Sequence, residues 1–567
     1  MVTTDHYSAA ELARQCALKG IRHAVISPGS RSAPLVRAFH AQDGIECLTV
    51  IDERSAAFFA MGMAQQLGSA VALICTSGSA VLNHGPAVAE AFYQRIPLLV
   101  LSADRPVEWI DQQEGQAIRQ RGVLAAHTNL SIELPQQAED DQTRWYCTRM
   151  INQALDATLL PAPGPVHVNL PFREPLYGQA REAFTRGRTI IQVATEAFLP
   201  PMQAETLTRT IGNSERVMVL VGQGNGDAAL HTGLRKLAAL PQVAVLTEAT
   251  SNQNDPAFLA AIDRLLGGID ANNKDELAPG LLITMGGAVV SKRIKTLLRQ
   301  WRPAQHWHVD PVDRHMDTYM SLTHSLALRP EMFLAQVGQE AKANESGYAD
   351  RWRALDEHTR QQHDRLLAAA PFCDLSVSRT ILARIPQGSQ VHLANSTAAR
   401  YAQLFPGTRD LRFFSNRGTS GIDGCTSTAL GACLVSRTPT TLITGDIAFC
   451  YDSNAFWNEH ASPLLRVIVI DNGGGNIFRY IPGPDSDPEL LPYFEAPHHR
   501  DPLALAQSYG LTCMEARDHD SLDRGLEELY KDHPGPAVLV VRTDGVLSAA
   551  TLRDYFEGLR NTLPGRP

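Results

Sequence analysis

The feature of this sequence that most restricts its fold is a series of short apolar runs, each followed by a polar or glycine-rich loop. Thr441-Leu442-Ile443 leads into Gly445-Asp446, and residues 467–470 lead into Asp471-Asn472. Continuous β-branched runs of this length are typical of strands buried on both faces of a parallel sheet. Loops after such strands form the carboxyl-end crevice where open α/β sheets bind ligands. The sequence therefore predicts an α/β protein with its site at strand ends.

The same order of strands and helices occurs twice in the chain. The strands of the first copy are expected at residues 71–75, 97–102 and 164–170, and those of the second at 440–444, 464–470 and 535–541. Strands and helices that alternate at these spacings predict two copies of one doubly wound, parallel-sheet domain. An alternative that stays open is that the two segments are unrelated α/β domains, which share this order of strands and helices without being copies.

A third α/β segment separates the two copies. It has apolar runs at residues 217–221, 243–246 and 281–285, and the stretch 192–203, with two prolines, indicates a linker before it. The chain has 567 residues, which is too long for a single hydrophobic core. We therefore expect three doubly wound parallel-sheet domains, at residues 1–185, 195–365 and 370–567.

Composition excludes several classes of protein. The net charge of −9 argues against a general nucleic-acid binder. No apolar run is long enough to cross a bilayer, and the first residues lack the apolar core of a signal peptide. The nine cysteines are scattered, without a Cys-x-x-Cys pair, which favours reduced thiols. We expect a cytoplasmic protein that binds neither nucleic acid nor membrane.

Two kinds of side chain on the predicted ligand-side loops indicate the chemistry. Asp446 and Asn472 follow neighbouring strands, and their oxygens suit a hard divalent cation such as Mg²⁺, which commonly bridges to a phosphate. Several arginines lie on similar loops, although the protein is acidic overall. Because the planar guanidinium binds carboxylates in a bidentate manner, these arginines indicate a polyanionic substrate.

Gly445-Asp446, followed by Asn472 and glycines, resembles the motif of thiamine diphosphate-dependent enzymes. Further stretches narrow the resemblance to the synthase family of the menaquinone pathway: residues 27–32, 52–54, 102–106, 115–120, 415–424 and 476–478. The likeness runs from about Leu12 to Val541. Two positions depart from the wider motif, because Ile447 replaces a small residue and Asp471 replaces an asparagine.

The resemblance implies thiamine diphosphate as cofactor, bound with Mg²⁺ or Mn²⁺. The implied metal ligands are Asp446, Asn472 and the carbonyl of Gly474. Glu53 would be the catalytic carboxyl, which shares a proton with the aminopyrimidine ring, and Phe58 and Phe59 would provide apolar surroundings. The implied cofactor contacts are Glu53, Asn395, Ile422, Gly445, Asp446, Ile447, Asn472, Asn476 and Ile477.

The resemblance also implies a transferase reaction: decarboxylation of 2-oxoglutarate and 1,4-addition of the succinyl carbanion equivalent to isochorismate. Ser396 and Arg400 would hold 2-oxoglutarate. The residues implied for isochorismate are Ser30, Arg31, Arg105, Gln116, Lys292 and Arg417, with Ile477 and Phe478 as apolar walls. The family places its cofactor between the first domain of one chain and the third of another, which implies a homodimer or homotetramer.

Other interpretations stay open. A thiamine diphosphate-dependent decarboxylase or carboligase acting on pyruvate would not need so many arginines. A non-catalytic nucleotide-binding or structural α/β protein would not need Glu53, Asp446 and Asn472 together. The residues His306, His308, Asp310, Asp313 and His315 are spaced like metal ligands, but a His-x-His pair on a strand ordinarily marks one face of that strand.

Overall fold

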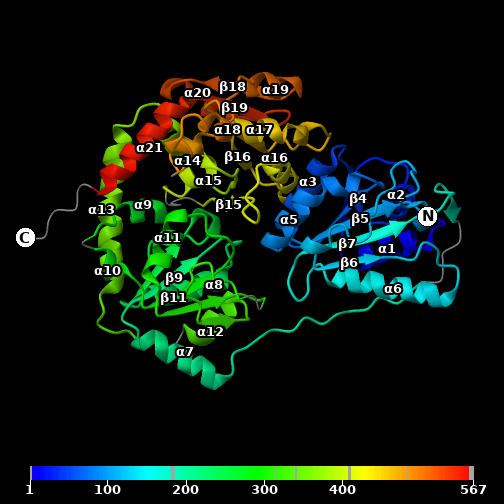
Figure 1. The fold of residues 1–567 in the computed structure, drawn as a ribbon, viewed down its shortest axis with the longest axis horizontal. Helices are drawn as coiled ribbons and strands as arrows, with labels where there is room; N and C mark the ends of the chain where they lie inside the picture. Colours follow the sequence, from blue (N-terminus) through cyan, green and yellow to red (C-terminus); the bar gives the residue numbers. More distant parts are fainter. Residues whose placement is uncertain are drawn as a thin grey trace, which may run out of the picture.

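The computed structural model describes residues 3–180, 186–271, 273–312, 315–338, 341–405, 410–481 and 483–560. The predicted domain ends at residues 185 and 567 lie outside these ranges. Three parallel sheets organise the chain into a first, a middle and a last α/β domain, which form three lobes in Figure 1. A two-stranded antiparallel sheet of β1 (Thr3–Thr4) and β8 (Gln179–Ala180) closes off the first domain.

The first and last sheets have the same strand order, which confirms the predicted repeat. The first sheet runs β3 (Glu46–Thr49), β2 (His23–Ile26), β4 (Val71–Cys75), β5 (Leu98–Asp104), β7 (Pro165–Pro171) and β6 (Leu130–Glu133). The last sheet runs β15 (Arg412–Phe414), β14 (Gln390–Leu393), β16 (Thr440–Gly445), β17 (Leu465–Asp471), β19 (Ala537–Arg542) and β18 (Thr512–Ala516). All pairs are parallel.

The middle sheet is also parallel and has five strands, in the order β10 (Val243–Thr247), β9 (Val217–Val221), β11 (Leu281–Met285), β12 (Gln305–Val309) and β13 (His324–Leu326). The segment that precedes this domain ends at Pro200, because Pro201 is the first residue of α7 (Pro201–Asn213). Proline suits this position, since the first helical N–H has no partner inside the helix. The linker predicted at 192–203 therefore wrongly included the first three residues of α7.

Helices cover the sheets on both faces, as a doubly wound fold requires. In the first domain they are α1 (Tyr7–Leu18), α2 (Ala33–His40), α3 (Glu53–Leu67), α5 (Gly85–Gln94) and α6 (Asp141–Asp156). The middle domain has α8 (Ala228–Ala238), α9 (Ile262–Gly267), α11 (Lys292–Trp301), α12 (Pro330–Val337) and the long α13 (Tyr348–Ala368). The last domain has α14 (Asp374–Arg384), α15 (Thr397–Ala402), α16 (Cys425–Ser436), α17 (Asp446–Tyr451), α19 (Pro502–Ser508), α20 (His519–Leu529) and α21 (Gly545–Arg560).

The first and last domains are joined where α3 crosses α16, the helices that follow the equivalent strands β3 and β15. Glycines allow this close crossing. A Cβ on Gly62 would overlap the carbonyl oxygen of Thr428, and one on Gly431 would overlap that of Phe59. One hydrophobic cluster consequently contains buried residues of both domains, including Phe58, Phe59 and Leu430. We call this contact the α3–α16 crossing.

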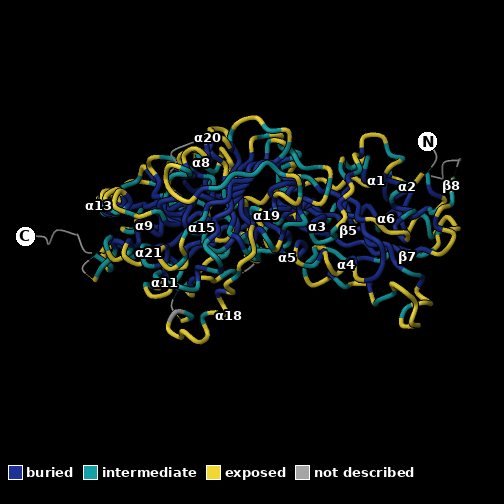
Figure 2. The backbone as a smooth tube through the Cα atoms, turned by 90° about the horizontal axis from the view of Figure 1, so that it is seen from above, coloured by how far each residue is buried: buried dark blue, intermediate teal, exposed yellow. Residues whose placement is uncertain are grey.

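Burial follows the sheets. Figure 2 shows the buried backbone running through the interior of the domains, with exposed loops around the outside. The central strands β4, β5, β16 and β17 are buried along almost their whole length, as expected for strands covered on both faces. Among the described residues, no helix is both long and apolar enough to cross a membrane.

Candidate active site

The predicted metal-binding residues come together at the carboxyl end of the last sheet. Its strand order reverses between β14 and β16, and ligands bind at such reversals in open α/β sheets. The loop after β17 reaches the end of β16, because the N–H of Gly473 donates to Asp446 Oδ2 at 2.9 Å. Asp446 and the segment containing Asn472 therefore lie side by side.

Asp446 is a buried carboxylate, 2% exposed, at the start of α17. Its Oδ1 accepts the N–H of Ile447 at 2.7 Å, and the imidazole Nε2 of His498 lies 3.4 Å from Oδ2. Burial raises the pKa of Asp446 to about 7, and the negative charge of Asp471 adds to the rise. A buried carboxylate beside a second carboxylate is stabilised by a cation. The electrostatics thus suit a divalent metal at this position.

Asp471 stands where the resembling family usually has asparagine, and the structure gives it a separate partner. Its carboxylate pairs with Arg542, which also binds Glu515 at 2.9 Å and Asp501 at 2.5 Å. Asp471 also accepts the N–H of Gly473 at 3.3 Å. Arg542 therefore holds the carboxylate of Asp471, and the next residue, Asn472, still presents an amide oxygen on this loop.

Asn472 and Asn476 both present amide groups to a buried carboxylate, that of Asp374. The Oδ1 atom of each asparagine is buried and has no hydrogen-bond partner among the described residues. Buried acceptors are ordinarily satisfied by protein groups or by water, so both oxygens are available to a ligand. The carbonyl of Gly474 accepts the N–H of Asn476 at 2.9 Å and keeps a second lone pair. The donor set is all oxygen, which fits Mg²⁺ or Mn²⁺.

The neighbouring predicted cofactor residues line the same edge. Ile422 packs against Ala394, Cys425 and Ala448, which places it between the end of β14 and α17. Gly445 precedes α17, where Ile447 is half-buried. Ile477 is buried, and the Phe478 ring lies 5.8 Å from that of Phe494, centroid to centroid.

Asn395 has a different environment from that of Asn472. Its Nδ2 donates to the carbonyls of Asn416 and Gly421, both at 2.6 Å, and its Oδ1 accepts from Arg417 at 2.7 Å. Both NH₂ donors of its amide are therefore used within the protein, and its oxygen already has one partner. In the structure Asn395 fixes the loop that carries Arg417 and Ile422.

A cluster of cations lies where the middle and last domains meet. We define the inner cationic cluster as Lys295, Arg400 and Arg417. The Nε atoms of Arg400 and Arg417 are buried and without hydrogen-bond partners. Burial lowers the pKa of Arg417, and the nearby charge of Arg400 lowers it further. Two adjacent guanidinium groups with unused donors have the chemistry that suits an anion.

Lys292 was predicted from the sequence, whereas Lys295, which lies near Arg400 and Arg417, was not named. Lys292 is exposed at the first position of α11, whereas Lys295 is half-buried one turn later. Burial lowers the pKa of Lys295, while the carboxylate of Glu248 partly offsets this effect and Arg417 adds to it. No described hydrogen bond or ion pair engages the Lys295 ammonium. The signal for Lys295 in the sequence was its position four residues after Ser291, the N-cap of α11, because residues four apart lie on the same face of a helix.

Glu248 orients α11 and was also missed. Its carboxylate is 1% exposed and accepts the N–H groups of Val290 and Ser291 at 2.6 and 2.7 Å. Burial raises its pKa to about 7. These bonds tie the end of β10 to the start of α11. Sequence alone gave no sign of them, because Glu248 resembles any acidic residue after a strand.

The remaining predicted substrate residues form a second set, in the first domain. Arg31 is buried and donates to the carbonyl of Phe172 at 3.0 Å, and Arg105 lies close enough to lower its pKa beyond the effect of burial. Ser30 and Gln116 are exposed on neighbouring loops. We call Ser30, Arg31, Arg105 and Gln116 the outer set. No described hydrogen bond or ion pair joins the outer set to the inner cationic cluster.

Two predicted substrate residues have strained backbones. Ser396 has φ +72° and ψ −124°, and Gln116 has φ +57°. Residues other than glycine rarely adopt such backbone angles, and the residues that do are concentrated at binding and catalytic sites. The strain therefore supports a functional role for both loops.

Glu53 is the first residue of α3, at the strand-to-helix junction that the sequence predicted. The side chain of Asp52 caps this helix by accepting the N–H of Ser55 at 3.0 Å. Glu53 is half-buried. Burial is the main cause of the raised pKa of Cys75, at the end of β4, and the charge of Glu53 raises it further. No described hydrogen bond or ion pair holds its carboxylate. The Phe58 ring faces Gly424, so it belongs to the α3–α16 crossing.

The other features are structural in this molecule. Thr284 Oγ1 bonds His306 and His308 at 2.9 and 2.8 Å, and Asp310 pairs with Arg95 at 2.6 Å. Asp313 lies outside the described residues, and the rest of the described chain holds no group of three His, Cys, Asp or Glu side chains placed for a metal.

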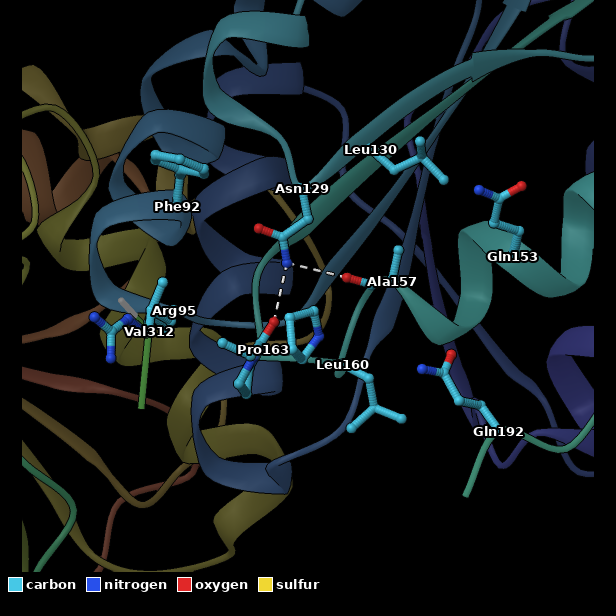
Figure 3. Close-up of a pocket in the computed structure, with 12 residues that line it drawn as sticks. Phe92, Arg95, Asn129, Leu130, Gln153, Ala157, Leu160, Pro163, Gln192 and Val312 are labelled. Carbon is cyan, nitrogen blue, oxygen red and sulfur yellow. Dashed lines mark hydrogen bonds between the residues drawn. The ribbon is translucent and has the colours of Figure 1, made fainter. Parts of the chain in front are cut away.

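A pocket of ≈ 380 Å³ lies between the first domain and the end of β12 (Figure 3). In it, Asn129 donates to the carbonyls of Ala157 and Ala162 at 3.0 Å. None of the predicted site residues lines this pocket. The candidate active site is therefore elsewhere, at the strand ends.

Comparison with known proteins agrees with this geometry. Three family models match the chain: "Thiamine pyrophosphate enzyme, N-terminal TPP binding domain" at residues 8–123, "Middle domain of thiamine pyrophosphate" at 203–393, and "Thiamine pyrophosphate enzyme, C-terminal TPP binding domain" at 395–541. Benzoylformate decarboxylase from Polynucleobacter necessarius has the same fold, with a TM-score of 0.71 at 15% identity, over 96% of this chain and 99% of that one.

Curated relatives are similar along almost the whole chain. The 2-succinyl-5-enolpyruvyl-6-hydroxy-3-cyclohexene-1-carboxylate synthase of Flavobacterium johnsoniae is 39% identical, over 96% of this chain and 97% of its own. The synthase of the same name from Desulfotalea psychrophila is 38% identical, over 94% and 98%. This chain therefore belongs to the 2-succinyl-5-enolpyruvyl-6-hydroxy-3-cyclohexene-1-carboxylate synthase family of thiamine pyrophosphate enzymes.

Proposed function

We propose that the protein catalyses the thiamine diphosphate-dependent decarboxylation of 2-oxoglutarate and the 1,4-addition of the succinyl carbanion equivalent to isochorismate. It would act in the cytoplasm, in menaquinone biosynthesis. The observation that carries the substrate assignment is the inner cationic cluster, with two buried guanidinium Nε atoms lacking partners. Both proposed substrates carry two carboxylates, and neighbouring cations without carboxylate partners suit such anions.

The metal site is proposed at Asp446, Asn472 and the carbonyl of Gly474, occupied by Mg²⁺ or Mn²⁺. Its support is the pair of unpartnered amide oxygens next to a buried carboxylate. The metal would anchor the cofactor diphosphate, while Ile422 would support the cofactor from the side of β14 and α17. The bound cofactor supplies the electron sink for decarboxylation. The protein contributes binding, orientation and charge.

Glu53 is proposed to hold and move the proton that activates the cofactor. Its support is position, because the carboxylate is half-buried at the end of the first sheet and is not engaged by any described residue. An unengaged carboxylate can exchange a proton with a ring nitrogen without first breaking a hydrogen bond. General acid–base groups must lie within hydrogen-bond reach of that atom.

Substrate binding is proposed to need both sets of cations. Ser396 and Arg400 would bind 2-oxoglutarate, with Lys295 adding a positive charge that the exposed Lys292 does not supply. Arg417 and the outer set would bind isochorismate, and Ile477 and Phe478 would form the apolar wall. Within one chain no described hydrogen bond or ion pair links the two sets, so a second copy would bring them together. The working unit is proposed to be a homodimer or homotetramer.

Carbon dioxide release tests this proposal. The purified protein would receive thiamine diphosphate and Mg²⁺, with 2-oxoglutarate or pyruvate, each with and without isochorismate. We expect fast release with 2-oxoglutarate plus isochorismate. Release from pyruvate would retain the cofactor assignment but refute the substrate assignment. No release under any condition would refute the proposed activity.

A further inference from the structure

We call residues 472–476, which carry the predicted metal ligands Asn472 and Gly474, the metal loop. Asp374 lies far from this loop in the sequence but contacts it in space. It is the first residue of α14 and is fully buried. Its Oδ2 accepts Nδ2 of Asn472 at 2.8 Å and Nδ2 of Asn476 at 3.4 Å. Its Oδ1 accepts the hydroxyls of Thr543 and Ser548 at 2.6 and 3.1 Å. One carboxylate therefore joins the metal loop to the start of α21.

These contacts dictate how the two amides face. An ionised carboxylate only accepts hydrogen bonds, so each asparagine must direct its NH₂ group toward Asp374. The Oδ1 atoms are then left for another partner, and both are buried without one among the described residues. Leaving a buried acceptor of this kind unsatisfied is unfavourable. A cation or its phosphate ligand would satisfy them.

We propose that Asp374 is a positioning residue, which fixes the amide of Asn472, and with it that of Asn476, so that their oxygens face the metal and the cofactor diphosphate. This inference rests on the proposed function, because it needs the metal at Asp446 and Asn472. Asp374 itself touches neither metal nor reacting atoms.

An asparagine at position 374 would lose this control. Its side chain has about the same shape, but one of its two polar atoms is an NH₂ group. That group cannot accept from the four donors that now converge on the carboxylate. If the new side chain turns its NH₂ group to the Thr543 and Ser548 hydroxyls, its one oxygen still accepts from both asparagines, but a neutral acceptor orients them more weakly than a carboxylate does. If it turns the NH₂ group to the asparagines instead, their amides lose their acceptor.

The test measures the binding of Mn²⁺ to the full chain in the presence of thiamine diphosphate. The electron paramagnetic resonance signal of free Mn²⁺ reports how much of the metal is not bound. Asp374→Asn is expected to weaken binding about tenfold or more, the usual effect of losing a partner that orients a metal ligand. The matched control is Asp452→Asn. Asp452 is also a fully buried carboxylate of the last domain, but it accepts from Ser427. This control is expected to retain Mn²⁺ affinity within about twofold.

A double-mutant cycle separates positioning from general stability. If Asp374 acts through Asn472, Asp374→Asn has little further effect on Mn²⁺ affinity once Asn472→Ala is present. Full additivity, or native affinity in Asp374→Asn, would overturn the inference. If Asp374→Asn does not fold, Asp374→Glu enters the same cycle, since it keeps the charge but displaces the carboxylate. Failure of the native protein to bind Mn²⁺ would instead refute the proposed metal site.

Discussion

At the scale of single residues, Glu53 offers the clearest test of chemistry. Glu53→Gln removes a charge and a proton acceptor, but it breaks no described hydrogen bond or ion pair. We expect thiamine diphosphate to bind as before, and turnover to fall by about 10²–10⁴-fold, the usual contribution of a general acid–base group. Calorimetry would measure binding and carbon dioxide release would measure turnover. Near-normal turnover would remove the proposed role.

Lys295 and Lys292 form a matched pair, because they are the same residue type on one helix. Lys295→Met is expected to raise the KM for 2-oxoglutarate about tenfold or more, since a hydrogen bond to a charged group contributes about 1.5–3 kcal/mol. Lys292→Met should have a smaller effect, because Lys292 is exposed. Steady-state kinetics of the two variants would decide. A larger effect at Lys292 would return the role to that residue.

Sequence and structure agree on residues whose position follows from a motif. Asp446, Asn472 and Glu53 each come directly after a strand or open a helix, so their placement needs only local information. Asp374 and Lys295 could not be placed in the same way. Asp374 reaches Asn472 only through the packing of α14 against α21, and Lys295 faces Arg417 only because two domains meet there.

At the scale of elements, the central strands were the easiest to predict. Residues 71–75, 217–221 and 281–285 match β4, β9 and β11 at both ends. These strands are covered on both faces, so nearly every residue must be apolar. The edge strands β15 and β18 were missed. Both are exposed in part and contain polar side chains, and their short sequences carry no continuous apolar run.

The α3–α16 crossing depends on glycine. Gly431→Ala would place a methyl group against the backbone of Phe59, which cannot move without shifting α3. We expect a loss of about 1–3 kcal/mol, the usual cost of overpacking, seen as a lower Tm. Gly85→Ala, with open space at the start of α5, is the control and should leave the Tm unchanged or slightly higher. Equal Tm values in the two variants would contradict this account.

At the scale of the whole molecule, the three domains differ in how far each has a core of its own. The two hydrophobic clusters of the middle domain contain only residues between 199 and 355. The cluster at the α3–α16 crossing instead draws on the first and last domains. The two domains with the same strand order therefore share one hydrophobic cluster. The middle domain contributes no residue to that cluster.

This difference predicts the behaviour of fragments. A fragment of residues 195–365 is expected to fold alone and to melt cooperatively, because its two main clusters lie within it, although Ala249 and Val290 pack in the cluster of the last domain. A fragment of residues 1–185 would expose the apolar face of α3, including Phe59 and Met63, and is expected to aggregate. Circular dichroism melts and size-exclusion chromatography would compare the fragments. A monomeric, cooperatively melting 1–185 fragment would contradict the shared core.

The α3–α16 crossing also has a consequence for synthesis on the ribosome. Translation delivers α3 early, but its partner α16 emerges only after the whole middle domain has left the exit tunnel. Through that interval the nascent chain carries an uncovered apolar helix, the kind of surface that chaperones bind. The middle domain can meanwhile complete its own core. The chain therefore reaches its final packing only when α16 meets α3.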